Sequence, residues 1–136
     1  MGDTTVYVYA GGFRDREDAC AYALDQWEPK PPPTATEAEY EAWEDRNPTW
    51  QMRSDLGEAY LDHDFIEVID DMEHLSRYDY LRSMLKNADD IAGILSSAGP
   101  DTNILVLIFK EALGGFEAQM RSTPRLTYCG EFPCTL

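Results

Sequence analysis

The residues with the chemistry to form a site are acidic and lie in one stretch, Gly57 to Asp71 (GEAYLDHDFIEVIDD). Six carboxylates stand in it without a Lys or Arg among them: Glu58, Asp62, Asp64, Glu67, Asp70 and Asp71. The same stretch contains the apolar residues Phe65, Ile66, Val68 and Ile69. Such a segment can be partly buried only if its apolar side chains face a core and its carboxylates face water, a metal ion or a basic partner.

A metal site is the first interpretation, built from Asp62, His63, Asp64 and His74, because neighbouring His and Asp are common metal ligands. A small metal-dependent hydrolase is therefore one candidate function. If the stretch is a strand, however, Asp62 and Asp64 point to one side and His63 to the other. The chain has only two His, so at most three groups converge. The pattern favours a solvated acidic strand edge, and we expect neither a bound metal nor another cofactor.

Other catalytic patterns are weaker still. Cys20 lies on the apolar stripe of an expected helix, which favours an inert thiol, and no Ser stands in a G-x-S-x-G elbow. The pairs Gly11-Gly12 and Gly114-Gly115 lack a phosphate-binding context and are simpler as turns. The three Cys include no C-x-x-C pair, which predicts free thiols. We do not expect an enzyme.

Composition limits the class of partner. A chain of 136 residues with 43% hydrophobic and 12% aromatic residues is long and apolar enough for one globular domain, residues 1–136. Its net charge of -15 argues against direct binding of nucleic acid, because phosphate contacts require clusters of Lys and Arg. No window approaches the roughly 18 apolar residues of a membrane span, and the N-terminus lacks signal-peptide features. We expect a cytoplasmic protein without a membrane partner.

Hydrophobic periodicity gives an order of elements. β-branched and apolar runs predict strands over Thr4–Ala10, Phe65–Ile69, Asn103–Phe109 and Arg125–Phe132, with Pro133 marking an edge strand. Helical spacing predicts helices over Arg14–Trp27 and Ala35–Arg46, and shorter ones after the capping boxes at Ser76 and Asn87. Leu113 to Thr123 reads as a turn or a long hairpin arm. The order predicts an α+β fold, with helices packed on one face of a mostly antiparallel sheet of about four strands.

Residues 28–50 form an acidic, proline-led excursion from this domain. Lys30 to Pro33 can continue neither a helix nor a sheet. Thr34 or Thr36 can then cap a helix whose apolar stripe is thin, held down by Trp43. The excursion is therefore predicted to be a surface helix.

A rigid acidic surface that carries Tyr and Trp has the composition of a protein interface, in which aromatic rings anchor and carboxylates steer and pair with Arg or Lys. The residues that we expect to bind the partner come from the central stretch and the excursion: Tyr60, Asp62, Asp64, Glu67, Asp70, Asp71, Glu37, Glu41, Trp43 and Glu44.

Three segments resemble bacterial immunity proteins of the Imm22 type: the first strand with Gly12-Phe13 and Tyr22, the stretch Tyr60 to Glu67, and Leu126 to Phe132. The excursion departs from that pattern. The resemblance implies an α+β inhibitor without catalysis that binds a cognate toxin protein, as a monomer or weak homodimer. The charge of this chain favours a basic, nuclease-like toxin. An acidic nucleic-acid mimic that occupies a nucleic-acid-binding protein shares the same electrostatics and is a further alternative.

Overall fold

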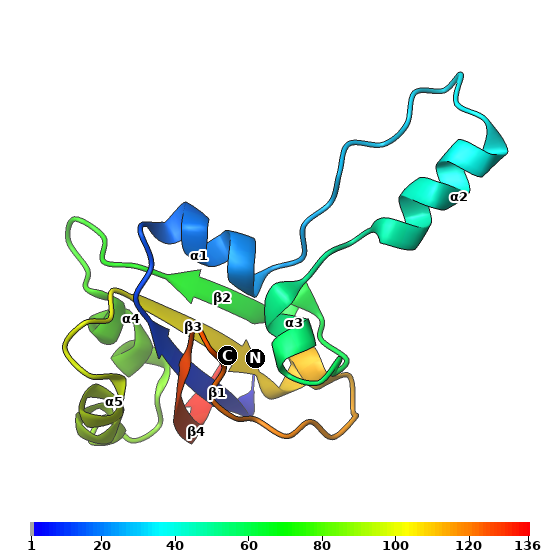
Figure 1. Cartoon of the computed structure of the whole chain (residues 1–136). Coiled ribbons are helices and arrows are strands. Elements are labelled where there is room, and N and C mark those ends of the chain that lie inside the picture. Colours follow the sequence, from blue (N-terminus) through cyan, green and yellow to red (C-terminus); the bar gives the residue numbers. More distant parts are fainter. Residues whose placement is uncertain (1) are drawn as a thin grey trace.

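A four-stranded antiparallel sheet forms the centre of the molecule (Figure 1), whose computed structural model describes residues 2–136. The strands run in the order β2-β3-β1-β4. Their bounds are β1 (Asp3–Gly11), β2 (Ile66–Ile69), β3 (Ile104–Phe109) and β4 (Thr127–Thr135). The predicted α+β class and antiparallel sheet are confirmed. Pro133 lies in β4, an edge strand, where a missing N–H is tolerated.

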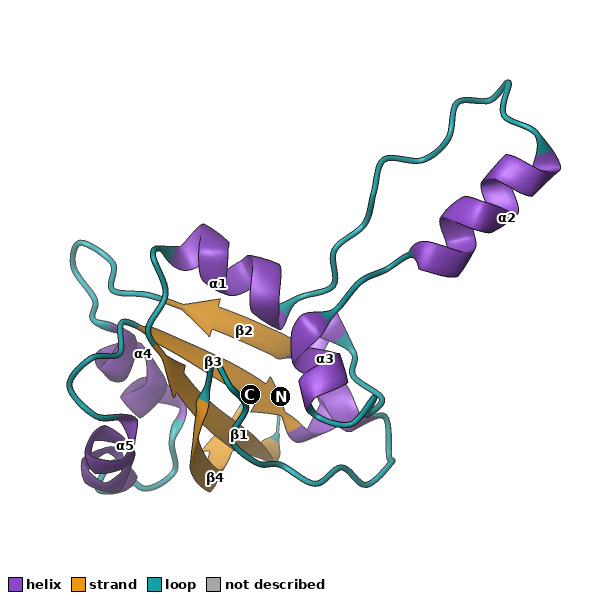
Figure 2. Cartoon of the chain, in the orientation of Figure 1, coloured by secondary structure: helices purple, strands orange, loops and turns teal. Residues whose placement is uncertain are grey.

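Across residues 2–136, five helices and two short 3-10 turns surround the sheet (Figure 2). They are α1 (Arg16–Ala23), α2 (Glu37–Arg46), α3 (Gln51–Asp55), α4 (Arg77–Met84) and α5 (Asp90–Ala98), with η1 (His63–Phe65) and η2 (Lys110–Leu113). Two predicted caps are confirmed: the Thr36 hydroxyl accepts from the Glu39 N–H at 3.1 Å, and the Ser76 hydroxyl accepts from the Asp79 N–H at 3.1 Å. These side chains satisfy amides that have no partner within the helix.

The helices cover both faces of the sheet, and the prediction that they lie on one face is wrong. Every residue of β3 is buried. Its even-numbered residues face a core shared with α1 and α3, and its odd-numbered residues face a second core shared with α4 and α5. A central strand that is apolar on both faces must be covered on both. The sheet is therefore the middle layer of three.

Two predicted boundaries were wrong for reasons of tertiary structure. Helix α1 ends at Ala23, not near Trp27, because Gln26 pairs with Thr49 as an isolated antiparallel bridge that draws the chain into an extended path. Residues 114–126 form no hairpin arm, because β1 lies between β3 and β4 in the sheet. They are an irregular connection across the end of the sheet. The capping box predicted at Asn87 differs slightly from the structure. The Asn87 side chain accepts from the Asp89 N–H in the turn that precedes α5.

The end of β1 leaves no space for a side chain at Gly11. A Cβ there would lie 2.6 Å from the Phe13 ring and 2.8 Å from the Arg125 carbonyl oxygen. We expect Gly11→Ala to lower the free energy of unfolding by about 1–3 kcal/mol, as overpacking does elsewhere. Urea denaturation measures the change. The control is Gly93→Ala within α5, where a Cβ meets nothing within 4 Å and the better helix former stabilises by roughly 0.5–1 kcal/mol. Equal effects at the two sites would contradict the packing seen at Gly11.

Candidate functional site

Residues 28–50 stand out from the body as an arm that carries α2 at its far end (Figure 1). We call this segment the acidic arm. Its base is closed by Gln26 and Thr49, each of which donates its N–H to the other's carbonyl oxygen, at 2.8 and 2.9 Å. The prolines at 31–33 keep the outgoing chain out of both helix and sheet. The excursion expected from the sequence is thus an ordered, projecting element.

The arm is held in shape by a small aromatic and polar cluster. Trp43 is 6% exposed, packs 5.8 Å from the Trp27 ring, and donates its indole N–H to the Glu28 carbonyl oxygen at 3.1 Å. Arg46 pairs with the Glu28 carboxylate at 2.9 Å. The Asn47 amide donates to the Trp43 carbonyl oxygen at 2.8 Å. Trp43 therefore packs inside the arm. Trp27, the last residue of the predicted first helix, is 56% exposed.

Three carboxylates form one stripe along α2. Glu37, Glu41 and Glu44 follow the i, i+4, i+7 spacing and line a shallow depression of about 530 Å³ together with Tyr40. All three are exposed. Within residues 2–136 none of them forms an ion pair; the nearby Arg46 is engaged by Glu28. Like charges at this spacing repel one another, so an external cation would stabilise the stripe.

The four residues of the metal interpretation, Asp62, His63, Asp64 and His74, do not come together in the structure. Asp62 to Asp64 are not in a strand: the Asp62 carboxylate accepts from the Asp64 N–H at 3.0 Å and starts the turn η1. His63 lies 3.5 Å from Asp25 and 3.2 Å from Asp64. His74 is exposed and neighbours only Glu73, at 3.9 Å. Nowhere between residues 2 and 136 do three His, Cys, Asp or Glu side chains gather closely enough to hold a metal ion.

Only one of the two carboxylate oxygens of Glu67 has a hydrogen-bond partner within residues 2–136. Its Oε1 accepts from the Tyr80 hydroxyl at 2.7 Å, whereas its buried Oε2 has no hydrogen-bond partner among residues 2–136. Burial, and then the hydrogen bond to Glu67, raise the pKa of Tyr80 to about 12. Tyr80 is therefore a neutral donor to a carboxylate that still has one free acceptor.

Asp71 is paired within the protein. Arg77 donates both its backbone N–H and its guanidinium to this carboxylate, at 2.9–3.0 Å, and these bonds hold the pKa of Asp71 below its usual range. Arg77 is largely buried, with 14% of its side chain exposed. Asp71 is thus a predicted partner-binding acid that has an internal, structural role.

A lowered pKa in the folded state means that the unfolded chain binds the proton more readily, so the stabilisation by Asp71 is complete above its ordinary pKa of 3.8 and is lost as the pH falls below it. We expect Asp71→Asn to lower the free energy of unfolding at pH 7 by at most about 1 kcal/mol, because the pair is exposed on one side. The difference from wild type disappears near pH 2. Urea denaturation at both pH values measures it. A deficit that persists at pH 2 would contradict this linkage, and Asp101→Asn is the exposed control.

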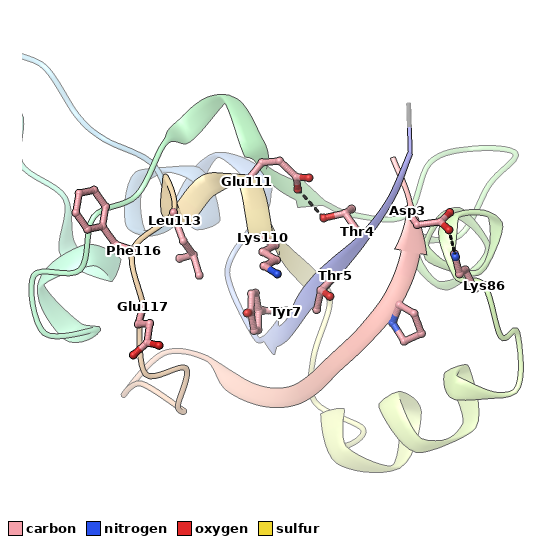
Figure 3. A pocket seen from close by; sticks show the side chains of 13 residues that line it. Asp3, Thr4, Thr5, Tyr7, Lys86, Lys110, Glu111, Leu113, Phe116 and Glu117 are labelled. Carbon is pink, nitrogen blue, oxygen red and sulfur yellow. Dashed lines mark hydrogen bonds and ion pairs between the residues drawn. The ribbon is translucent and has the colours of Figure 1, made fainter.

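Tyr60 contributes to a separate surface. Its ring is 52% exposed and lies 5.4 Å from that of Phe116, which is 64% exposed. Phe116 lines an open groove of about 890 Å³ with Tyr7, Lys110 and Glu111 (Figure 3). Sequence reasoning missed this groove because its walls come from both ends of the chain. Its charged groups are partly engaged internally, since Lys86 forms an ion pair with Asp3 and the Thr4 hydroxyl donates to the Glu111 carboxylate at 2.7 Å.

The predicted partner-binding residues therefore fall on several surfaces rather than one. The arm carries Glu37, Glu41 and Glu44; the edge of the sheet carries Glu67 and Asp70; Tyr60 lies near η2. Of these, the arm stripe is the most exposed and the least paired.

Comparison with known proteins adds no relative. No protein-family model matches the chain, and neither a curated protein nor a solved structure matches it. Across residues 2–136, every helix is too short or too polar to cross a bilayer.

Proposed function

We propose that this chain is an immunity protein: a module without catalysis that binds a basic, nuclease-like bacterial toxin in the cytoplasm of the producing cell and neutralises it. The observation that carries the proposal is the acidic arm: its helix α2 stands away from the body (Figure 1) and carries Glu37, Glu41 and Glu44, which form no ion pair within residues 2–136. A folded protein gains nothing for its own stability from such a stripe, whereas a cationic partner would pair with it.

The arm also has the shape that inhibition requires. A projecting helix can lie across the mouth of the substrate groove of a nuclease, where its exposed carboxylates face the Lys and Arg that otherwise contact phosphates. The net charge of -15 attracts a basic protein over a long range and speeds association. Trp27, exposed at the base of the arm, supplies an aromatic anchor of the kind that dominates interface energies.

The test is a pull-down with the tagged protein against the product of the gene immediately upstream, followed by titration at low and high salt. We expect one tightly bound partner whose affinity falls at least about tenfold between 0.05 and 0.5 M salt, because exposed charges are screened over shorter distances. Absence of binding would refute the proposal. Stoichiometric zinc or manganese on protein purified without added metal would instead favour hydrolysis, and capture of an unrelated nucleic-acid-binding protein would favour the mimic.

A further inference from the structure

The outer edge of β2 carries no neighbouring strand among residues 2–136. Within them β2 pairs only with β3, and Val68 at its centre is 5% exposed. The Val68 carbonyl oxygen accepts from the Arg16 guanidinium at 3.1 Å, so this carbonyl points away from β3. In an antiparallel ladder the N–H and C=O of one residue point to the same side, so the Val68 N–H points outward as well. An edge with a free N–H and a C=O held only by a side chain is a template for a further strand.

A groove of about 550 Å³ follows this edge. Arg16 and Leu24, at the two ends of α1, line one side, and Met72 and Tyr80 line the other. Figure 1 shows α1 lying alongside β2. The floor is β2 itself, including Val68. This arrangement, a strand edge between two side-chain walls, is the one in which extended peptides bind by strand addition.

An acceptor that lacks a donor lies just beneath the wall of the groove. Glu67 lines the groove, and its buried Oε2 has no hydrogen bond from any of residues 2–136, so a donor in the groove reaches this oxygen when the carboxylate turns outward. A buried acceptor left unpaired is unfavourable, and a cationic donor makes the strongest hydrogen bond to a carboxylate. Asp70 adds a second negative charge to the groove, while its one cation, Arg16, is already engaged by Val68. The groove therefore suits an extended segment that carries Lys or Arg.

We propose that β2 receives an extended segment of the basic partner as a fifth strand of the sheet, and that a Lys or Arg of this segment donates to the Oε2 of Glu67. The inference rests on the proposed function for the identity of that partner. A second copy of the chain is the poorer occupant, because pairing β2 with β2 would bring Glu67 and Asp70 of both copies together in a dimer of two chains that each carry a net charge of -15.

The first test measures binding of the upstream gene product to Glu67→Gln and Val68→Pro. Glutamine keeps the acceptor for Tyr80 but removes the charge, and we expect the affinity to fall at least about 30-fold, the lower end of the effect of breaking a buried charge pair. Proline removes the outward N–H and spares the bonds to β3, as edge prolines do. The matched control is Glu131→Gln on the opposite edge strand, β4, which should change the affinity less than about twofold.

The second test does not depend on a substitution at a buried position, and it decides the matter if Val68→Pro fails to fold. Amide exchange of Val68, followed by nuclear magnetic resonance, should slow at least about tenfold when the wild-type protein is saturated with the partner.

The outcomes separate the two proposals. If the wild type binds the partner but Glu67→Gln binds equally well and Val68 exchange is unchanged, strand addition at β2 is wrong and the immunity function stands. If the wild type binds nothing, the proposed function fails and takes this inference with it. If Val68 exchange slows in the isolated protein as its concentration rises, the occupant is a second copy and the inference is overturned.

Discussion

Replacing Glu37, Glu41 and Glu44 with lysine slows association with the basic partner by about 10- to 100-fold at low ionic strength, and changes the dissociation rate far less. The stripe lies on a projecting helix, is exposed, and forms no ion pair with any of residues 2–136. Exposed charges act mainly on the encounter of two proteins, whereas buried pairs act on the lifetime of the complex. The three substitutions also convert an attractive surface into a repulsive one, which accounts for the size of the effect.

The measurement is stopped-flow or surface-based kinetics at several salt concentrations. The difference from wild type should shrink towards 1 M salt, where the Debye length is about 3 Å. The matched control reverses three other exposed acids that are outside any ion pair between residues 2 and 136, and gives the same change in net charge: Glu17, Glu117 and Glu131. In this control we expect the logarithm of the association rate constant to fall by less than about a third of its fall in the arm variant.

Two results would contradict the proposed role of the arm in speeding association. If the control slows association as much as the arm variant, only net charge matters and the position of the stripe is irrelevant. If the arm variant changes the dissociation rate instead, the stripe is buried in the complex and pairs directly with the toxin. The salt dependence distinguishes these cases, because a buried pair is screened much less.

The parts of the fold that the sequence predicts are those decided by local physics. The continuous apolar run Asn103–Phe109 predicted a strand, and β3 spans Ile104–Phe109. Thr36 and Ser76 could be identified as caps because a hydroxyl three residues before an unpaired amide reaches it within the same turn. In each case the residues that form the structure are neighbours along the chain.

The wrong predictions concern segments whose structure depends on residues that are distant in the sequence. Trp27 fits the helical stripe of the preceding residues, yet the bridge of Gln26 to Thr49 ends α1 early and leaves the ring exposed. Asp62 and Asp64 alternate as in a strand, but the Asp62 carboxylate captures a nearby amide and folds them into η1. Neither the competing bridge nor the turn is visible in hydrophobic periodicity.

The same contrast between local and long-range contacts applies to the candidate site. The acids of α2 could be placed on one helical face from their spacing alone. The internal partners of Glu67 and Asp71 could not, because Tyr80 and Arg77 reach them only after α4 folds back onto the sheet. Pairing by tertiary structure thus separates acids that serve the fold from acids that are free for a partner.

The core on the face of the sheet opposite the base of the arm can be tested at its centre, where Leu107→Ala should lower the free energy of unfolding by about 3–5 kcal/mol. Leu107 is fully buried in β3, opposite Val8 of β1 and Glu67 of β2, on the face that packs against α4 and α5. Strands on both sides prevent the backbone from moving into the cavity, so the loss lies towards the upper end of the range for this substitution.

Leu95→Ala is the matched control, since Leu95 belongs to α5 but is 46% exposed. It should change the stability by less than about 0.5 kcal/mol. Urea denaturation followed by circular dichroism measures both variants, and an unchanged slope with a lower midpoint would show that stability alone has changed. A loss of 1 kcal/mol or less for Leu107→Ala would mean that the two cores can repack around the gap.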